Sequence, residues 1–190
     1  GVITDAPTLS KLGLAPMTPA MSKAVLVEEF NRILISKITL PGFKRGVDVF
    51  IEKPDLLPFE EAKLYGHNAI HALIAYLGAR HGLTVMSEAA AYPEIMATAR
   101  AAFLEESGAA LIGKYGKLGD PIFTPAGYAA YVDDLLARMV RPTLNDLIAR
   151  VTRDQVRKLG WDDRLFGTMR LALQHGIQPV HMAKGAAAAV

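Results

Sequence analysis

The fold is decided by residues 63–78, which read KLYGHNAIHALIAYLG. On an α-helix each residue turns the chain by about 100°, and one wedge of the helix then collects four polar and two small residues. These are Lys63, His67, Asn68, His71, Ala75 and Gly78. The rest of the circumference is apolar, which is typical of a buried helix that faces a cavity. The segment therefore predicts a core helix with a ligand site on one side.

Helix boundaries can be assigned on either side of this segment. Pro58 suits the first helical position, and Glu60 and Glu61 suit the first turn, where the helix dipole favours anions. The spacing predicts a helix from Pro58 to about Ala79. Similar start and stop signals predict four further helices, over 93–115, 124–139, 143–159 and 162–175.

The N-terminal part of the chain has a different character. Residues 1–24 contain three prolines and scattered small residues, so we expect an irregular linker or loop. Residues 24–36 are rich in β-branched side chains and favour a strand, although a short helix also fits them. The alternation over 46–52 predicts a second strand. We therefore expect a mainly α, multi-helical fold with a short β segment near the N-terminus, and a helical domain over 25–190.

The composition excludes several classes of protein. The chain has 190 residues, enough for a substantial core, and 51% of them are hydrophobic. A net charge of +2 gives no dense basic face for a nucleic acid. The lack of cysteine excludes disulfides and thiolate metal sites and fits a cytoplasmic protein. No apolar run is long enough to cross a membrane, and residues 1–24 lack the order of a signal peptide.

The polar wedge is compatible with three interpretations. The first is ordinary packing, with Lys63 reaching solvent and a core histidine satisfied by one hydrogen bond. The second is a metal site on His67 and His71, but the hydrolytic zinc motif needs a Glu where Asn68 stands. The third is metal-free alcohol oxidation, in which a desolvated Lys63 takes the hydroxyl proton, Asn68 stabilises the oxyanion and His71 holds a neighbouring hydroxyl. That reaction needs a cofactor to accept the hydride.

The spacing Lys63-x4-Asn68-x2-His71 resembles the catalytic signature of the polyol-specific long-chain dehydrogenases. The likeness covers about residues 25–190, nearly the whole chain. Residues 105–108 and 114–116 look like the family's next helix. The segments that look like its mannitol-1-phosphate branch are 138–150, 153, 157–159, 163–165 and 175–189.

The resemblance implies a fold like the helical C-terminal domain of 6-phosphogluconate-dehydrogenase-like enzymes. It implies an NAD-dependent reaction without metal that interconverts mannitol 1-phosphate and fructose 6-phosphate, with Lys63, Asn68 and His71 as catalytic residues and His67 as a substrate contact. A mannitol 2-dehydrogenase or a hexuronate reductase is the alternative within the family. A non-catalytic helical interaction module is the alternative outside it. The expected small-molecule partner is a sugar alcohol or sugar phosphate, with no nucleic acid and no membrane.

The chain departs from the family before Lys63. It has no G-x-G-x-x-G after a strand and no room there for the βαβ fold that binds NAD. The family's second catalytic asparagine is absent too. The resemblance therefore implies that NAD is bound mainly by a Rossmann domain missing from this chain, which alone would be inactive. The final run 185–190, GAAAAV, is typical of a helix in progress, so we expect the natural protein to continue; a frayed terminal helix is the alternative.

Basic residues recur in the predicted helix over 143–159. Arg150, Arg153 and Arg157 stand at i, i+3 and i+7 and would share one helix face, with Lys158 next to them. Because Arg matches the geometry of phosphate, at least one of these four residues is expected to bind the phosphate of a sugar phosphate. The alternative is a solvated face with ordinary i, i+4 ion pairs to aspartates.

Overall fold

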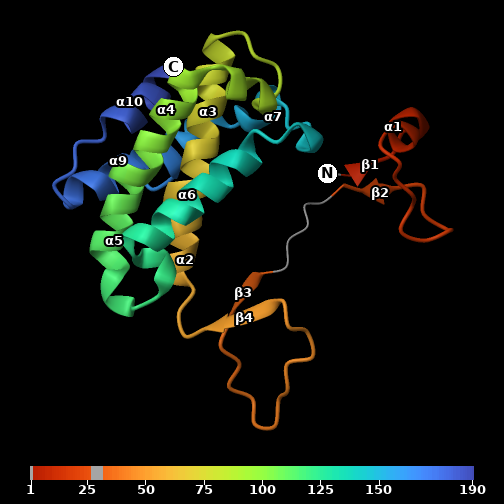
Figure 1. Ribbon diagram of the computed structural model, residues 1–190, viewed down its shortest axis with the longest axis horizontal. Helices are drawn as coiled ribbons and strands as arrows, with labels where there is room; N and C mark the ends of the chain where they lie inside the picture. The colour runs from red at the N-terminus through yellow and green to blue at the C-terminus, as the bar shows by residue number, and fades with distance from the viewer. Residues whose placement is uncertain (1, 27–31) are drawn as a thin grey trace. The chain divides into compact units, whose positions relative to one another are not determined.

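Figure 1 presents a computed structural model of the chain, which describes residues 2–26 and 32–190. The chain divides into two compact units, Gly1–Leu56 and Leu57–Val190. The larger unit is helical and the strands are short, so the expected mainly α class is confirmed. Residues 25–56 fall in the first unit, whereas the sequence pattern groups them with the helical domain. Among the described residues, no helix is both long and apolar enough to span a bilayer.

The described residues of the first unit form two separate pairs of strands. The strands are β1 (Val2–Ile3) antiparallel to β2 (Ala24–Val25), and β3 (Ile33–Ser36) parallel to β4 (Phe50–Lys53). The single strand expected over 24–36 is thus two short strands, and part of that prediction, 27–31, lies outside the described residues. The second expected strand begins at Phe50, later than predicted.

Residues 1–24, which the sequence predicts to be irregular, contain one short helix. Helix α1 (Ala6–Lys11) begins after Asp5, whose carboxylate accepts a 2.8 Å hydrogen bond from the Thr8 N–H. Pro7 lies in its first turn, where the missing N–H costs nothing. A capping aspartate and an early proline therefore begin a helix in a stretch that otherwise has loop composition.

The predicted core helix is confirmed as one continuous helix from Leu57 to Arg80. It consists of α2 (Leu57–Glu61), a π-helical segment η1 (Ala62–Asn68) and α3 (Ala69–Arg80). Large apolar residues on several sides of α3 are fully buried, among them Ile70, Leu73 and Ile74. Such burial requires neighbours all round, and α3 packs against α4, α7, α9 and α10 (Figure 1).

Most of the other predicted helices are confirmed. The long helix over 93–115 is α4 (Pro93–Ala101), η3 (Ala102–Gly108, again π-helical) and α5 (Ala109–Tyr115). The last helices are α6 (Pro125–Met139), α9 (Arg164–Gln174) and α10 (Val180–Ala188). Short 3-10 turns connect some of these elements: η2 (Met86–Ala91), η4 (Gly116–Leu118) and η5 (Pro121–Phe123).

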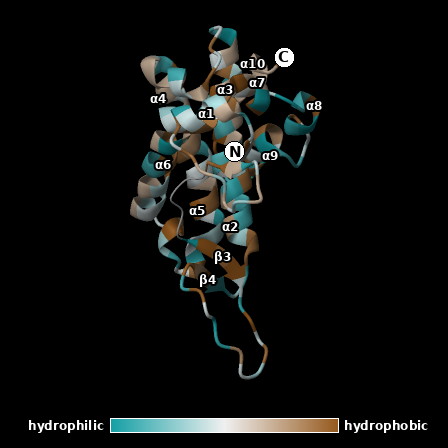
Figure 2. Cartoon of the chain, turned by 90° about the vertical axis from the view of Figure 1, so that its right-hand side faces the viewer, coloured by the Kyte–Doolittle hydropathy of each residue, from teal (hydrophilic) through white to brown (hydrophobic). Residues whose placement is uncertain are grey.

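The predicted helix over 143–159 is wrong. The segment instead contains the 3-10 turn η6 (Pro142–Leu144) and two single-turn helices, α7 (Ile148–Val151) and α8 (Gln155–Lys158). Asn145 and Asp154 adopt φ values of 45° and 56°, and a left-handed residue ends an α-helix. In Figure 2 the hydrophilic α8 lies beside α9, which it contacts.

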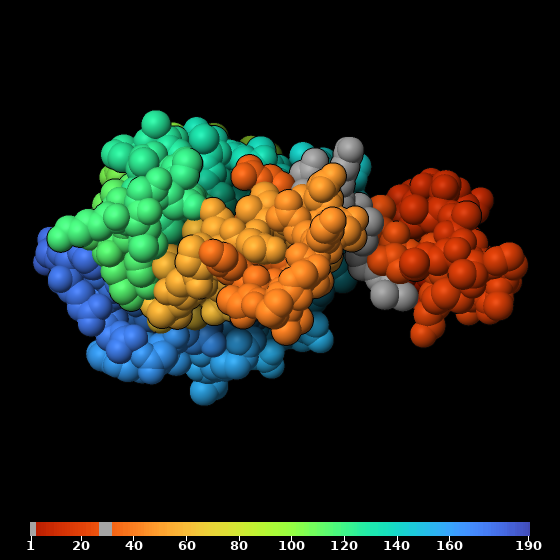
Figure 3. All heavy atoms as spheres, turned by 90° about the horizontal axis from the view of Figure 1, so that it is seen from below, coloured from red at the N-terminus to blue at the C-terminus, as the bar shows by residue number. Residues whose placement is uncertain are grey.

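The two π-helical segments pack against each other. At Gly66 in η1, an added Cβ would lie 2.8 Å from the Phe103 ring and 2.9 Å from the Tyr128 hydroxyl. At Gly108 in η3, it would lie 2.6 Å from the Tyr128 ring. Glycine is therefore required at position 66 for η1 to approach η3, and at position 108 for η3 to approach Tyr128. On the face seen in Figure 3, residues of η1 and α9 also lie side by side, in agreement with their contacts.

A buried carboxylate in η3 caps the N-terminus of the last helix. Glu106 is 2% exposed and accepts hydrogen bonds of 2.7 and 2.9 Å from the N–H groups of His181 and Met182. These are among the first N–H groups of α10, which have no partner within the helix, and Pro179 before them provides no side-chain cap. Glu106 thus replaces a local cap and places its negative charge at the positive end of the helix.

Gly108→Ala tests the close approach of η3 and Tyr128. The new methyl group would clash with the Tyr128 ring and with the Phe103 carbonyl, 2.9 Å away. We expect the free energy of unfolding in urea to fall by about 1–3 kcal/mol, the usual cost of overpacking. Gly116→Ala is the control, since its nearest contact would be an ordinary 3.6 Å. Equal stability of the two variants would contradict this packing.

Glu106→Gln tests the remote cap of α10. The amide group of Gln can accept only through its one oxygen, so one buried N–H loses its partner and the helix loses the charge. We expect a destabilisation of about 1–3 kcal/mol by thermal or urea unfolding. Glu105→Gln, one residue earlier and exposed, is the matched control and should stay within about 0.5 kcal/mol of the parent.

Candidate active site

A pocket of about 210 Å³ is lined by the start of α3 and by the segment 150–164. The first wall contains Asn68, His71 and Ala72. The second wall contains Arg150, Val151, Arg153, Asp154, Arg157, Lys158 and Arg164. The structure therefore brings together two of the three predicted catalytic residues and all four predicted basic residues.

The basic residues do not share a helix face, so the expected arrangement is wrong although its members do line one pocket. Arg150 lies in α7, Arg153 in the loop that follows and Arg157 in α8. The left-handed conformation of Asp154 interrupts the helix between them. The pocket wall is thus built from short turns, and the loop conformation brings the arginines together.

His71 contacts a carboxylate that the sequence pattern did not single out. Its Nε2 lies 2.9 Å from Asp146 Oδ2, and Arg150 Nε donates to Asp146 Oδ1 at 2.8 Å. Burial opposes ionisation of Asp146, but the hydrogen bonds from His71 and Arg150 outweigh it and hold the pKa of the carboxyl below its ordinary value. Asp146 thus fixes the orientation of the His71 ring and joins it to one pocket arginine.

Backbone hydrogen bonds fix the position of Asp146 itself. The Met86 N–H donates to the Asp146 carbonyl at 2.8 Å, and the Ile148 N–H donates to the Thr84 carbonyl at 3.0 Å. Thr84, the partner of Ile148, is fixed in turn by Glu88, whose carboxylate accepts a 2.7 Å hydrogen bond from the Thr84 N–H. The carboxylate that orients His71 therefore stands on a braced turn.

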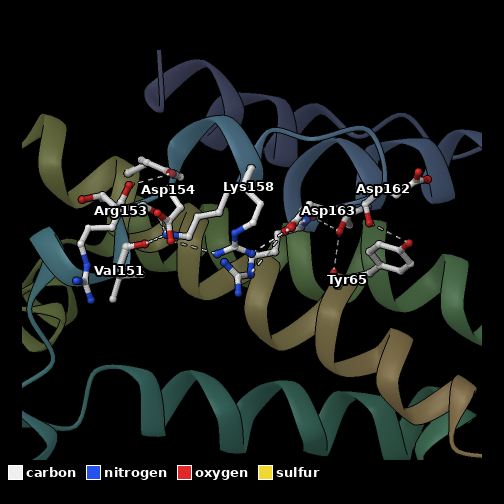
Figure 4. A network of polar contacts seen from close by, with 12 residues as sticks. Tyr65, Val151, Arg153, Asp154, Lys158, Asp162 and Asp163 are labelled. Carbon is white, nitrogen blue, oxygen red and sulfur yellow. Dashed lines mark hydrogen bonds and ion pairs between the residues drawn. The ribbon is translucent and has the colours of Figure 1, made fainter.

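Lys158 binds the backbone of the pocket wall. Its side chain is buried, and its ammonium donates to the carbonyl oxygens of Val151 and Arg153 (Figure 4). Burial, reinforced by the positive charge of Arg164, lowers the pKa of the Lys158 ammonium. Lys158 thus satisfies carbonyl groups left without partners where the predicted helix is interrupted.

Arg157 and Arg164 differ in their partners although both lie near Asp163. Arg157 Nη1 donates to Asp163 Oδ2 at 3.2 Å, and its Nη2 lies 3.5 Å from Asp154 Oδ2. Arg164 Nε lies 3.8 Å from Asp163 Oδ1. This Nε atom is buried and has no hydrogen-bond partner in the part of the chain that the structure describes. Asp163 and its neighbours appear in Figure 4.

The pocket has a positive excess of charge. Five cationic side chains line it against the single carboxylate of Asp154. Two further carboxylates, outside the lining, contact these cations: Asp146 at Arg150 and Asp163 at Arg157. Five positive charges against three negative ones leave an excess of two, with histidine taken as neutral. Such a pocket favours an anionic ligand.

Lys63 and His67 do not line the pocket. Lys63 is exposed, so the residues that the structure describes do not supply the desolvation expected for a general base. The ring of His67 lies edge-on to that of His71, with 6.2 Å between their centroids. The predicted wedge assumed an α-helix, but Lys63, His67 and Asn68 lie in η1, where hydrogen bonds span five residues and change the angle between side chains.

The start of η1 is tied to the end of α5. Lys114 Nζ donates to both oxygens of Glu61, at 2.9 and 2.7 Å, and the Tyr115 hydroxyl donates to Glu61 at 2.7 Å. These contacts fix the helix two residues before Lys63.

No group of three or more His, Cys, Asp or Glu side chains within 2–26 and 32–190 is arranged to hold a metal ion.

Two residues of the site, Asp146 and Arg164, are not apparent from the sequence pattern. Asp146 has the i, i+4 spacing of an ordinary surface pair with Arg150, and its contact with His71 spans 75 positions. Arg164 follows Arg157 by seven residues, but it lies in the separately predicted helix over 162–175 and was therefore not grouped with the other arginines. Only its position directly after the capping Asp163 marks it as a residue near a helix terminus.

Comparison with known proteins agrees with this geometry. Residues 55–190 match the family described as "Mannitol dehydrogenase C-terminal domain". The mannitol-1-phosphate 5-dehydrogenase of Bacillus licheniformis is 35% identical over 166 residues, which is 87% of this chain and 42% of that protein. The enzyme of the same name from Brevibacillus brevis is 34% identical over 166 residues, or 87% of this chain and 41% of its own length.

The chain therefore spans about two fifths of the length of these relatives. The family match covers well over half of the chain and includes every residue that lines the pocket. On this evidence the chain belongs to the mannitol dehydrogenase C-terminal domain family.

Proposed function

We propose that this chain is the substrate-binding and catalytic part of an NAD-dependent polyol dehydrogenase, with mannitol 1-phosphate and fructose 6-phosphate as its substrate pair. The observation that carries the proposal is the meeting of Asn68 and His71 with five cationic side chains in one pocket. Groups suited to a hydroxyl or carbonyl stand there beside groups suited to a phosphate. The names of the two relatives support the same substrate class.

The proposed roles follow from the side chains. The Asn68 amide donates a hydrogen bond to the oxygen on which negative charge develops during oxidation. His71, held through Nε2 by Asp146, binds a substrate hydroxyl and fixes its orientation. Lys63 takes the hydroxyl proton. Its exposure in this chain means that the intact protein must cover it, because burial is what makes a lysine a base near neutral pH.

The described residues do not fit NAD. The parallel strands β3 and β4 have no helix between them, and no glycine-rich turn follows either strand. We propose that the nucleotide is bound by a Rossmann domain outside this chain. There NAD would supply the hydride acceptor, and the present residues would bind, orient and deprotonate the alcohol.

The alternatives predict different substrates. A mannitol 2-dehydrogenase would use the unphosphorylated polyol, and a hexuronate reductase would use the pocket cations for a carboxylate. A helical interaction module would turn over none of these compounds. The positive excess in the pocket favours an anionic substrate, and an assay of the intact protein with mannitol 1-phosphate, mannitol and a hexuronate separates these possibilities.

Lys63→Met in the intact protein tests the general base. We expect kcat for mannitol 1-phosphate, followed as NADH formation, to fall by about 10²–10⁴-fold, the usual contribution of a positioned base. Lys117→Met is the control, because Lys117 is also exposed and lies outside the pocket. Full activity of the Lys63 variant would remove this residue from the mechanism.

Asp146→Asn tests the positioning of His71. Asn keeps the shape of the side chain but loses the charge that holds the His71 ring, and we expect kcat/KM to fall on the order of 10²-fold. Asp133→Asn, at an exposed ion pair with Arg100, should leave activity unchanged. Unchanged activity in both variants would refute the positioning role.

Asp146→Asn should also change how the stability of the protein depends on pH. The pKa of Asp146 is lower in the folded than in the unfolded state, so its contribution to stability is complete above the unfolded pKa of about 3.9. That contribution is lost as the pH falls through the lower, folded pKa. The stability advantage of the parent over Asp146→Asn should therefore shrink below about pH 4.

A further inference from the structure

The five cations of the pocket are not equally available to a ligand. Arg150 donates to Asp146, and Arg157 contacts both Asp163 and Asp154. Lys158 is occupied by two backbone carbonyl groups. Three of the five cations therefore already have close partners that a ligand would have to share or displace.

Arg164 is in a different position. Its Nε is buried without a hydrogen-bond partner in the described part of the chain, and the nearest carboxylate oxygen is 3.8 Å away, beyond hydrogen-bond distance. A buried donor left unsatisfied is costly, typically about 1–3 kcal/mol. The backbone N–H of Arg164 already has a partner, because it donates a 2.7 Å hydrogen bond to Asp163 Oδ1. The donor without a partner is thus Nε of the guanidinium group, and Arg164 is one of the residues that line the pocket.

Arg153 is the second available cation. It is exposed, and its Nε donates only to the carbonyl of Arg150, at 3.4 Å. It has no carboxylate partner within the described residues. Arg153 comes from the loop before α8 and Arg164 from the start of α9, so the two guanidinium groups belong to different elements of one pocket wall.

We propose that Arg164, with Arg153, is the phosphate-recognising pair that selects a phosphate monoester over the neutral polyol. This rests on the proposed function and assigns its specificity to two residues, leaving Arg150 to the His71 pair and Lys158 to the backbone. A guanidinium group presents paired donors that match two phosphate oxygens. A phosphate dianion would supply the acceptor that Arg164 Nε lacks and would offset the positive excess of the pocket.

Titration of the present 190-residue chain with inorganic phosphate tests this pair directly, by calorimetry at constant ionic strength. We expect Arg164→Met to weaken phosphate binding by about 10-fold or more, as for loss of a hydrogen bond to a charged group. Arg170→Met is the matched control. It removes the same charge from the same helix, but Arg170 pairs with Asp162 and stacks on Trp161, outside the pocket, so binding should change less than about twofold.

Three outcomes would overturn the proposal: no phosphate binding by the parent chain, binding by Arg164→Met equal to the parent, or equal weakening by both variants. Circular dichroism verifies that the variants fold. If Arg164→Met does not fold, Arg164→Lys takes its place, because Lys keeps the charge and loses the paired donors. Arg164→Lys should still weaken phosphate binding several-fold. Binding equal to that of the parent would overturn the assignment.

The intact protein separates this proposal from the proposed function. There, Arg164→Met should lower the ratio of kcat/KM for mannitol 1-phosphate to that for mannitol by about 10-fold. A parent protein that oxidises no polyol would refute the dehydrogenase, while the phosphate titration would still judge the Arg164 site. A parent that oxidises mannitol 1-phosphate with the ratio unchanged in the variant would refute only the role of Arg164.

Discussion

The helical unit is organised by the burial of α3 on all sides. Each fully buried Leu or Ile of this helix contributes about 1.5–3 kcal/mol of hydrophobic stabilisation, and that burial requires partners around the whole circumference. The partners approach closely because small residues stand at the crossings. At Gly185 of α10 an added Cβ would lie 2.7 Å from Leu73, and at Gly78 of α3 it would lie 2.9 Å from Ile148. Helix α3, with His71 in its first turn and Asn68 directly before it, is thereby held rigidly inside the unit.

This constraint explains why the long helices could be predicted from the sequence. A helix that is apolar nearly all round is marked by a long run of apolar residues, and the prolines and glycines at its ends are local signals. Residues 57–80 and 93–115 carry both kinds of signal, and their helices were predicted to within a few residues. The π-helical segments in both helices could not be predicted in this way. They depend on the contact between Gly66, Gly108 and the Tyr128 side chain, which is a tertiary contact.

The errors have related physical causes. The segment 143–159 has helical composition, but its ends are fixed by contacts far away in sequence, including the bonds of Asp146 and Ile148 to residues 84–86. Asn145 and Asp154 tolerate the left-handed conformation better than most residues, and they are where the predicted helix is interrupted. The sequence identified the arginines that meet in the pocket, but the helix face on which it grouped them does not exist. Asp146 escaped prediction because its role depends on these long-range contacts, and Arg164 because it begins a different helix from the other arginines.

The irregular wall and the buried helix contribute different properties to the pocket. Interrupting a helix exposes carbonyl groups, and the pocket wall uses the Lys158 ammonium to satisfy two of them. The turn that precedes the wall is braced against residues 84–86, and from it Asp146 reaches the His71 ring. The ring therefore has fixed partners on two sides, its own helix in the core and a carboxylate on a braced turn. Catalysis by orientation needs such rigidity, because misplacement by about 1 Å can cost on the order of 10²-fold in rate.

Lys63 has no comparable support in the described chain, since it is exposed in η1 and its chemistry needs burial. The two halves of the proposed reaction thus have different requirements: the substrate hydroxyls are held by groups that this chain already fixes, whereas proton removal depends on what covers Lys63.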